Sequence, residues 1–297
     1  MLDLHRLVLL RAVAMHGSIT AAARELAYSH SAISQQLALL ERETGAVLLE
    51  KVGRTSRLTP VGRELVQNTE AVLAAMAHAE TELAAAQGEP RGIVTVAVFT
   101  SIARIVLPSA LLALAEKYPG LDVRLRRSDP QDAVQQLIAR QVDAVVTDTF
   151  PGERVSPVGG LHAATIGRDP VRGYLPPAMM DRPLDRVPWV LEPQQAASRH
   201  WALRVCRESG FEPMVAHESS DMLFHLRMVE AGLAAAFLPD LVVREAGSEI
   251  EPCDSLPSNL QRDILVLTRQ GTEAHPALNA VREAIASALQ KHVSKPD

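Results

Sequence analysis

The sequence has 297 residues, too many for one small core, and this length predicts two or three folded units. Its 47% apolar and 22% charged residues are ordinary for a globular protein and exclude an intrinsically disordered chain. The net charge of −5 excludes a uniformly basic surface for nucleic acid. Residues 1–62 nevertheless hold seven Lys and Arg against five Asp and Glu, so a nucleic-acid partner remains open for that segment.

Two further classes of protein are excluded. No apolar run is long enough for a membrane helix, and His5, Arg6 and Arg11 interrupt the apolar N-terminal stretch, so neither a membrane span nor a signal sequence fits. We therefore expect a cytoplasmic protein without a membrane partner. The two cysteines, Cys206 and Cys253, have no metal-ligand pair beside them, which argues against a disulfide scaffold or a zinc site. They are either unpaired structural thiols or redox sensors.

Three short helices are predicted at the start of the chain. Asp3 is suited to cap a helix that ends before Gly17, and Ser18 is suited to cap a second helix, "ITAAARELA". After a turn, Ser29 caps a third helix that runs to the glycine stop at Gly45.

The third predicted helix has two distinct faces. Ile33, Leu37 and Leu40 recur at spacings of four and three, so they share a core-facing side. The opposite side is small, polar and uncharged, and consists of Ser31, Ser34, Gln35 and Ala38. Small side chains let a helix approach base pairs, while Ser and Gln exchange hydrogen bonds with bases or phosphates. Two short helices with this face on the second predict a helix-turn-helix that enters a major groove.

A short two-stranded wing is predicted over residues 47–62, where apolar and polar residues alternate around Gly53. Lys51, Arg54 and Arg57 lie within it. A basic hairpin beside a recognition helix is suited to hold phosphates or to enter a minor groove.

A long helix without a breaker is predicted next, from Val61 to about Gln87, with Thr59 as its cap and Pro60 at its first position. Its apolar seam alternates by four and three, as in a coiled coil: Leu65, Thr69, Val72, Met76, Ala79, Leu83 and Ala86. The helix is packed either on its own domain or against a second copy of the chain. The length of the seam favours pairing between copies.

The rest of the chain predicts an α/β domain. Strands over 93–99, 121–127 and 142–148 alternate with helices over 101–120 and 130–141, an order that implies a doubly wound parallel sheet. A second lobe follows, with strands over 170–176, 187–192, 212–218 and 233–239 and helices over 196–209 and 220–232. A strand over 261–269 and a helix over 275–293 close the chain.

The N-terminal stretches "GSITAAARELAYSHSAISQQLALLERETGAVLLEK" and "GRTSRLTPVG" resemble the LysR-type transcriptional regulators. Later stretches such as "GIVTVAV", "QLIARQVDAVVTD" and "MVEAGLAAAFLPDLV" extend the likeness over nearly the whole chain. The resemblance implies three parts: a winged helix-turn-helix over 1–60, a dimerising linker helix over 61–89 and a periplasmic-binding-protein-like effector domain over 90–297. The first lobe of that domain would span about 90–165 and 265–297, and the second about 166–264.

The resemblance also implies a partner and an assembly. It predicts a homodimer formed through the linker helix, a homotetramer, and binding to an interrupted palindromic promoter site in double-stranded DNA. The family's DNA-reading positions fall on Ser29, His30, Ser31, Ser34 and Gln35, with Arg54 in the wing. His30 stands where the family usually has glutamine. The alternatives for His30 are a contact with a base, a contact with a phosphate, and exposure to solvent alone.

A small-molecule effector is expected at the carboxyl ends of the parallel strands, where helix N-termini point amide groups into the cleft. Such a site suits a carboxylate or another small anion, and no cofactor is predicted. The candidate contacts are Thr100, Ser101, Ser128, Asp148, Thr149, Gln194, Gln195, His217 and Ser219. Further charge is available nearby from Arg126, Arg127, Arg199 and His200, which are otherwise surface residues.

Two rival functions remain. A hydrolase assembled from Ser101, Asp148 and His217 is one, although the sequence has no GxSxG, HExxH, P-loop or GxGxxG motif with its acidic partner. The other is a DNA-binding protein that takes no ligand.

Overall fold

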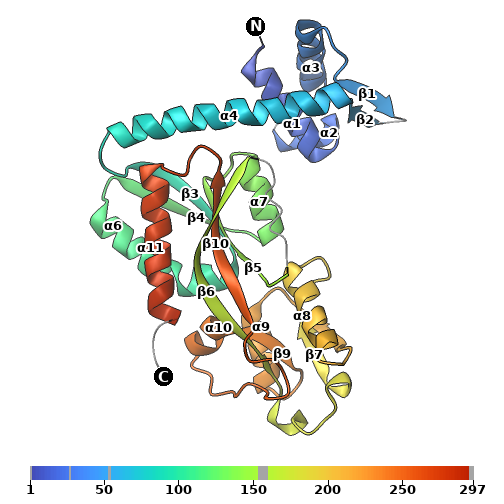
Figure 1. The fold of residues 1–297 in the computed structure, drawn as a ribbon, viewed down its shortest axis with the longest axis vertical. Helices are drawn as coiled ribbons and strands as arrows, with labels where there is room; N and C mark the ends of the chain where they lie inside the picture. The colour runs from blue at the N-terminus through green and yellow to red at the C-terminus, as the bar shows by residue number, and fades with distance from the viewer. Residues whose placement is uncertain (1, 27, 53–54, 153–159, 294–297) are drawn as a thin grey trace. The chain divides into compact units, whose positions relative to one another are not determined.

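The computed structural model describes residues 2–26, 28–52, 55–152 and 160–293 (Figure 1). Two compact units make up the chain, one consisting chiefly of residues 1–82 and the other chiefly of the residues from Leu83 onward. Arg54, a predicted DNA contact, lies outside the described residues.

The first unit begins with three helices, α1 (Leu4–His16), α2 (Ile19–Glu25) and α3 (His30–Thr44). Their predicted caps are confirmed, because the side chains of Asp3, Ser18 and Ser29 each accept a hydrogen bond from a backbone N–H in the first turn. Gly17 and Gly45 end α1 and α3 in the left-handed conformation that favours glycine. The start and stop of each helix are therefore determined locally.

The core of this unit confirms the predicted inner face of α3. Ile33, Leu37 and Leu40 are buried and pack with apolar residues of α1 and α2, including Leu10 and Ala22. Because these three side chains fix the rotation of α3, its polar side faces away from the core.

A two-stranded hairpin, β1 (Leu49–Val52) and β2 (Thr55–Leu58), leads into the long helix α4 (Pro60–Ala86). Thr59 Oγ1 accepts a hydrogen bond from the N–H of Gly62 at 3.0 Å and donates to the Val47 carbonyl at 2.8 Å. A Cβ on Gly62 would lie 2.3 Å from the Leu48 carbonyl oxygen, so only glycine lets α4 start this close to the hairpin.

The two alternatives for the α4 seam apply to different parts of the helix. Leu65 packs on the core of its own unit, as the intramolecular alternative requires. Farther along, Val72, Met76 and Leu83 are 44%, 43% and 67% exposed. Among the described residues of the single chain, an apolar stripe without a cover therefore begins about three turns into α4.

The second unit contains a six-stranded sheet in the order β4-β3-β5-β10-β6-β9. Its strands are β3 (Gly92–Val98), β4 (Leu121–Arg127), β5 (Ala144–Thr149), β6 (Leu161–Tyr174), β9 (Ala236–Pro239) and β10 (Gln261–Arg269). The pairs β3–β4 and β3–β5 are parallel, which confirms the predicted βαβαβ start.

The βαβαβ order predicted parallel pairing for β3, β4 and β5 only, and the other three strands of the sheet pair antiparallel. β10 is antiparallel to both β5 and β6, and β6 is antiparallel to β9. The physical reason is the path of the chain, which leaves the parallel half along β6 and returns along β10, so these long neighbours run in opposite directions (Figure 1). A separate two-stranded parallel sheet is formed by β7 (Pro188–Leu191) and β8 (Met214–Glu218).

The helices of this unit mostly follow prediction. Those that match one predicted helix are α7 (Pro130–Ile138), α8 (Ala197–Glu208), α9 (Met222–Glu230) and α11 (Pro276–Val293). The single helix predicted over 101–120 instead divides at Val106 into α5 (Thr100–Ile105) and α6 (Leu107–Lys117), because Pro108 can start a helix but cannot continue one. Three short helices were not predicted: α10 (Asp240–Glu245) and the 3₁₀ turns Pro177–Met179 and Leu184–Arg186.

Two main cores hold the second unit. The larger one lies between the sheet and the helices α6, α9, α10 and α11, with α11 packed beside α6 (Figure 1). The other gathers aromatic side chains around β7 and α8, where the fully buried Trp189 stacks on Phe237 at 5.3 Å between ring centroids. Several side chains of this second core also line a cavity in the same unit.

Candidate functional site

An exposed polar face runs along the N-terminal half of α3. The exposed side chains on it are those of His30, Ser31, Ser34 and Gln35. Ser29 also lies at this end, but its Oγ accepts the capping hydrogen bond from Ala32 N–H at 3.1 Å and shares a hydrogen bond with the Ser31 hydroxyl at 3.0 Å. The cap holds two hydroxyls together at the helix entrance, where backbone N–H groups favour a phosphate.

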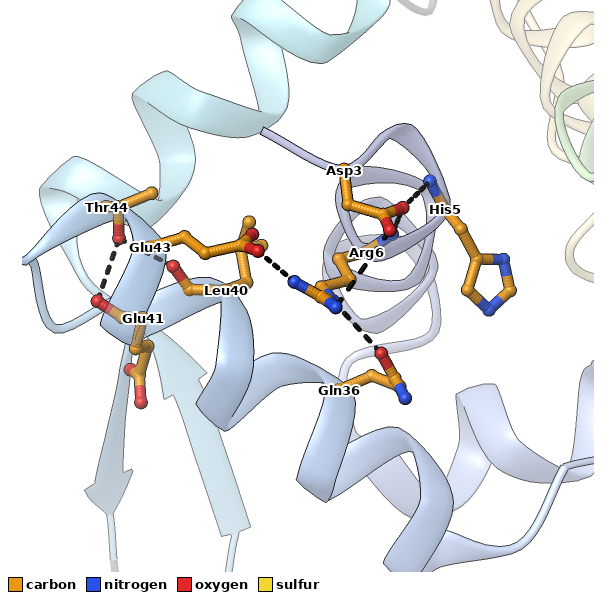
Figure 2. Close-up of polar contacts among 8 residues, drawn as sticks. All are labelled: Asp3, His5, Arg6, Gln36, Leu40, Glu41, Glu43 and Thr44. Carbon is orange, nitrogen blue, oxygen red and sulfur yellow. Dashed lines mark hydrogen bonds and ion pairs between the residues drawn. The ribbon is translucent and has the colours of Figure 1, made fainter. Parts of the chain in front are cut away.

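Two adjacent glutamines of α3 have different surroundings. Arg6 of α1 donates from Nε to Gln36 Oε1 at 3.1 Å and also pairs with Glu43, as Figure 2 shows. Gln36 is therefore engaged in holding α3 against α1, whereas Gln35 is exposed. The helical spacing in the sequence places Gln35 on the outward face, and the structure adds the contact with Arg6 that engages Gln36.

The wing is tied to α3 by one carboxylate. Glu41 Oε1 accepts hydrogen bonds from the N–H groups of Leu48 and Leu49 at 2.7 and 3.1 Å. At the end of α3, the Thr44 hydroxyl donates to the carbonyl oxygens of Leu40 and Glu41 (Figure 2). These bonds fix where the hairpin begins relative to the exposed polar face of α3.

Lys51 and Arg57 of the wing lie on different sides of the hairpin. Lys51 is paired in register with Ser56, and Arg57 with Glu50. Since successive side chains of a strand point to opposite faces, Lys51 and Arg57 cannot both face the same way. Both are exposed.

A cavity of about 250 Å³ opens in the second unit, where the ends of β3, β5 and β7 meet the N-termini of α5, α7, α8 and α9. This is the place predicted from the strand order. Of the predicted effector contacts, the ones that line the cavity are Thr100, Ser101, Asp148 and Gln195. The ones that lie outside its lining are Ser128, Thr149, Gln194, His217 and Ser219.

Some of the residues outside the lining have other contacts. Ser128 is buried and shares hydrogen bonds with Gln136. The Ser219 hydroxyl accepts from Asp221 N–H at 3.1 Å, and its carbonyl pairs with Nε2 of the buried His225 at 2.8 Å. Burial lowers the pKa of His225, so its ring is neutral and donates to that carbonyl. Of the four additional charged candidates, only Arg199 lines the cavity.

Arg262, which the sequence analysis does not single out, organises the cavity. Its side chain is 3% exposed and donates to Asp169 at 2.8 Å and to Asp148 at 3.0 Å. It also reaches the Ser101 hydroxyl at 3.3 Å and stacks over Phe99. Burial alone would lower the pKa of Arg262, but the two carboxylates more than offset this effect and raise it. The sequence does carry one signal for it. Arg262 stands two positions before the apolar Ile264 on the predicted strand, so both side chains share the buried face.

Glu192 also lines the cavity and was not predicted as an effector contact. Burial raises the pKa of its carboxyl to about 7. A hydrogen bond from Ser198 lowers this pKa, and the neighbouring charge of Asp148 raises it further. The charge of the cavity therefore changes near neutral pH.

The proposed hydrolase residues do not form a triad in this arrangement. The Ser101 hydroxyl accepts from Arg262, and so does Asp148. His217 is exposed on β8 and is not part of the cavity lining. Neither Ser101 nor Asp148 is thus bonded to a base that would activate a nucleophile.

Both cysteines are buried in the aromatic core and neither forms a disulfide. Burial raises the pKa of the Cys206 thiol to about 12, which keeps it protonated and unreactive at neutral pH. This favours the structural alternative for Cys206.

Among the described residues, no group of His, Cys, Asp and Glu is arranged to hold a metal ion. Across the same part of the chain, every helix is too short or too polar to cross a membrane.

Family models match both units of the chain. Residues 4–63 match the bacterial regulatory helix-turn-helix protein, lysR family, and residues 87–290 match the LysR substrate binding domain. The chain belongs to the LysR family of transcriptional regulators. It is a DNA-binding regulator that combines a helix-turn-helix with an effector-binding domain, as the sequence resemblance predicts.

Similar proteins span most of this LysR-type regulator. The probable regulator LrrA of Synechococcus elongatus is 31% identical over 89% of each chain. The transcriptional dual regulator GltC of Bacillus subtilis is 28% identical over 72% of this chain and 73% of its own.

Solved structures share the fold. HinK from Pseudomonas aeruginosa has a TM-score of 0.58 at 20% identity and covers 98% of this chain and 100% of its own. CbnR complexed with its target DNA has a TM-score of 0.52 at 23% identity and covers 97% of this chain and 99% of its own. These likenesses concern the fold alone.

Proposed function

We propose that this LysR-type regulator reads a promoter site through the exposed face of α3 and that a small molecule in the cavity of the second unit changes this binding. The observation that carries the first half is the polar face itself, which is small, uncharged and held outward by a buried apolar side. The contacts proposed are Ser29, His30, Ser31, Ser34 and Gln35 on bases and phosphates, with Lys51, Arg57 and, outside the described residues, Arg54 on the backbone.

The exposed stripe of α4 supports an assembly. Val72, Met76 and Leu83 would be covered by the same stripe of a second copy, giving a homodimer with two recognition helices. Such a dimer matches an interrupted palindrome, and two dimers give the homotetramer implied by the family resemblance. CbnR, whose structure is known with its target DNA, supports a DNA partner for this fold. A cytoplasmic location follows from access to DNA.

Selection from a random library of DNA duplexes tests the proposal. The full-length protein is expected to enrich two half-sites related by two-fold symmetry, with affinity that falls as salt rises. Recovery of duplexes without a shared sequence would contradict specific reading.

Gln35 and Gln36 form a matched pair for testing the recognition face. Gln35→Ala is expected to weaken binding to the selected duplex by roughly tenfold to a hundredfold, because a good bidentate base contact contributes about 1–3 kcal/mol. Its free energy of unfolding should stay unchanged, since the side chain is exposed. Gln36→Ala should instead destabilise the first unit through the lost Arg6 bond, with base preference retained. Fluorescence anisotropy and urea unfolding measure the two effects, and equal losses of affinity would contradict this assignment.

His30 gives a pH-dependent test of the same face. Because imidazole gains a positive charge on acidification near neutral pH, DNA affinity is expected to fall more steeply with rising pH in the wild type than in His30→Gln. The measurement is the dissociation constant for the selected duplex across pH 5.5–8. Parallel profiles would exclude a charge-dependent contact by His30.

A DNA-binding protein without a ligand remains the alternative to the second half of the proposal. A metabolite that shifts the unfolding temperature and changes the affinity for the selected duplex would exclude it.

A further inference from the structure

Aromatic side chains form much of the apolar wall of the cavity. The chain has only two Trp, three Tyr and five Phe residues. Four of these ten line this cavity, namely Phe99, Phe150, Trp201 and Phe237. The rings of Phe150 and Trp201 lie 4.7 Å apart between centroids, and those of Trp201 and Phe237 lie 5.5 Å apart. Aromatic faces carry partial negative charge and attract organic cations.

The guanidinium groups in the lining already have carboxylate partners. Arg262 is held by the two aspartates described above. Arg199 pairs with Glu218 at 2.6 Å, and Arg104 pairs with Glu245 at 3.1 Å. An anionic ligand would have to compete with a carboxylate of the protein for Arg199 and Arg262. Arg104 keeps its ion pair with Glu245, although its buried Nε has no hydrogen-bond partner among the described residues.

Carboxylates outnumber guanidinium groups in the lining, five to three. The five are Asp129, Asp132, Asp148, Glu192 and Asp221. Asp129 and Asp132 lie at the start of α7 and Asp221 caps α9, so the positive ends of these two helices are already matched by acidic residues. Glu192 forms no ion pair among the described residues. Above about pH 7, where Glu192 ionises, the lining therefore offers, next to an aromatic wall, a carboxylate without an ion-pair partner in the described part of the chain.

We propose that the effector is a small organic cation, an amine or amidine attached to an apolar body. Its N–H groups bind at Glu192 and its body packs on Trp201 and Phe150. This inference rests on the proposed function, in which the cavity takes the effector, and it replaces the anionic ligand expected from the helix N-termini. The volume of about 250 Å³ limits the ligand to the size of a small metabolite.

Three probes of one shape separate charge from apolar packing: phenethylamine, phenylpropanoate and phenethyl alcohol. Titration calorimetry on the full-length protein is expected to show phenethylamine binding roughly tenfold or more tightly than either of the others. Glu192→Gln should remove this preference while keeping the shape of the side chain. Asp132→Asn, an exposed position at the cavity edge, should weaken phenethylamine in the same direction by less. Glu251→Gln changes an exposed carboxyl outside the lining and should match the wild type.

Three results would overturn the inference: tighter binding of phenylpropanoate, equal binding of phenethylamine to wild type and Glu192→Gln, or no binding of any probe. Urea unfolding of each variant separates a lost contact from a lost fold. The duplex selection is scored independently, so a protein that binds phenylpropanoate but still enriches a palindrome retains the proposed function and loses only the cationic ligand. Failure to enrich any sequence contradicts the proposed function instead.

Discussion

Replacing Arg262 with glutamine is expected to lower the free energy of unfolding of the second unit by about 3–5 kcal/mol. Asp169 is fully buried, and its pKa is raised by burial and lowered by Arg262, its ion-pair partner. Without Arg262, Asp169 is left either charged and unpaired or protonated, and both states are unfavourable in the interior. The variant also loses the bonds to Asp148 and Ser101, two residues of the cavity lining.

Tryptophan fluorescence measures this effect selectively. The only two tryptophans of the chain, Trp189 and Trp201, both lie in the second unit. Urea unfolding followed by this signal reports that unit within the full-length protein. Arg168→Gln is the matched control, because Arg168 pairs with Asp263 on the same two strands but is 68% exposed. A surface pair of this kind contributes at most about 1 kcal/mol, so similar losses in the two variants would contradict a special role for Arg262.

Glu192→Gln is expected to stabilise the second unit at alkaline pH. Because the folded-state pKa of Glu192 is about 7 and the ordinary value is 4.5, the folded protein keeps a proton that the unfolded chain releases between these values. Stability from this group is therefore fully present below about pH 4.5 and is lost as pH rises through about 7. The full difference is on the order of 3 kcal/mol, an upper figure because the carboxyl borders the cavity. Asp129, Asp148 and Arg262 also act on this carboxyl and remain in the variant.

The measurement is the difference in unfolding free energy between wild type and Glu192→Gln at pH 4.5 and pH 8.5 by tryptophan fluorescence. The variant should gain relative to the wild type only at the higher pH. Glu251→Gln, with an exposed carboxyl, should show no such gain. A pH-independent difference would mean that Glu192 has an ordinary pKa.

The first unit could be predicted from sequence almost completely because its information is local. Ser18 and Ser29 are caps that act within one turn, and the spacing of Ile33, Leu37 and Leu40 determines which side of α3 faces out. The same spacing places Gln35 on the outward face. The bond between Arg6 and Gln36 joins residues that lie 30 positions apart along the chain, so no local pattern reveals it.

The sequence predicted where the cavity lies but only some of the residues that line it. Strand order located the ends of β3 and β5, which gave Thr100, Ser101 and Asp148. His217 follows the same pattern but lies outside the lining, because the side chains at the end of a strand take different directions.

By itself, the sequence determined the family, the winged helix-turn-helix and the order of strands and helices, because caps, apolar periodicity and turn residues act between near neighbours. Only the tertiary structure decided the mixed sheet and the burial of Arg262 between two aspartates. It also decided the charge balance of the cavity. Arg262 meets Asp148 and Asp169 across separations of 114 and 93 residues, and such contacts exist only once β10 has paired with β5 and β6.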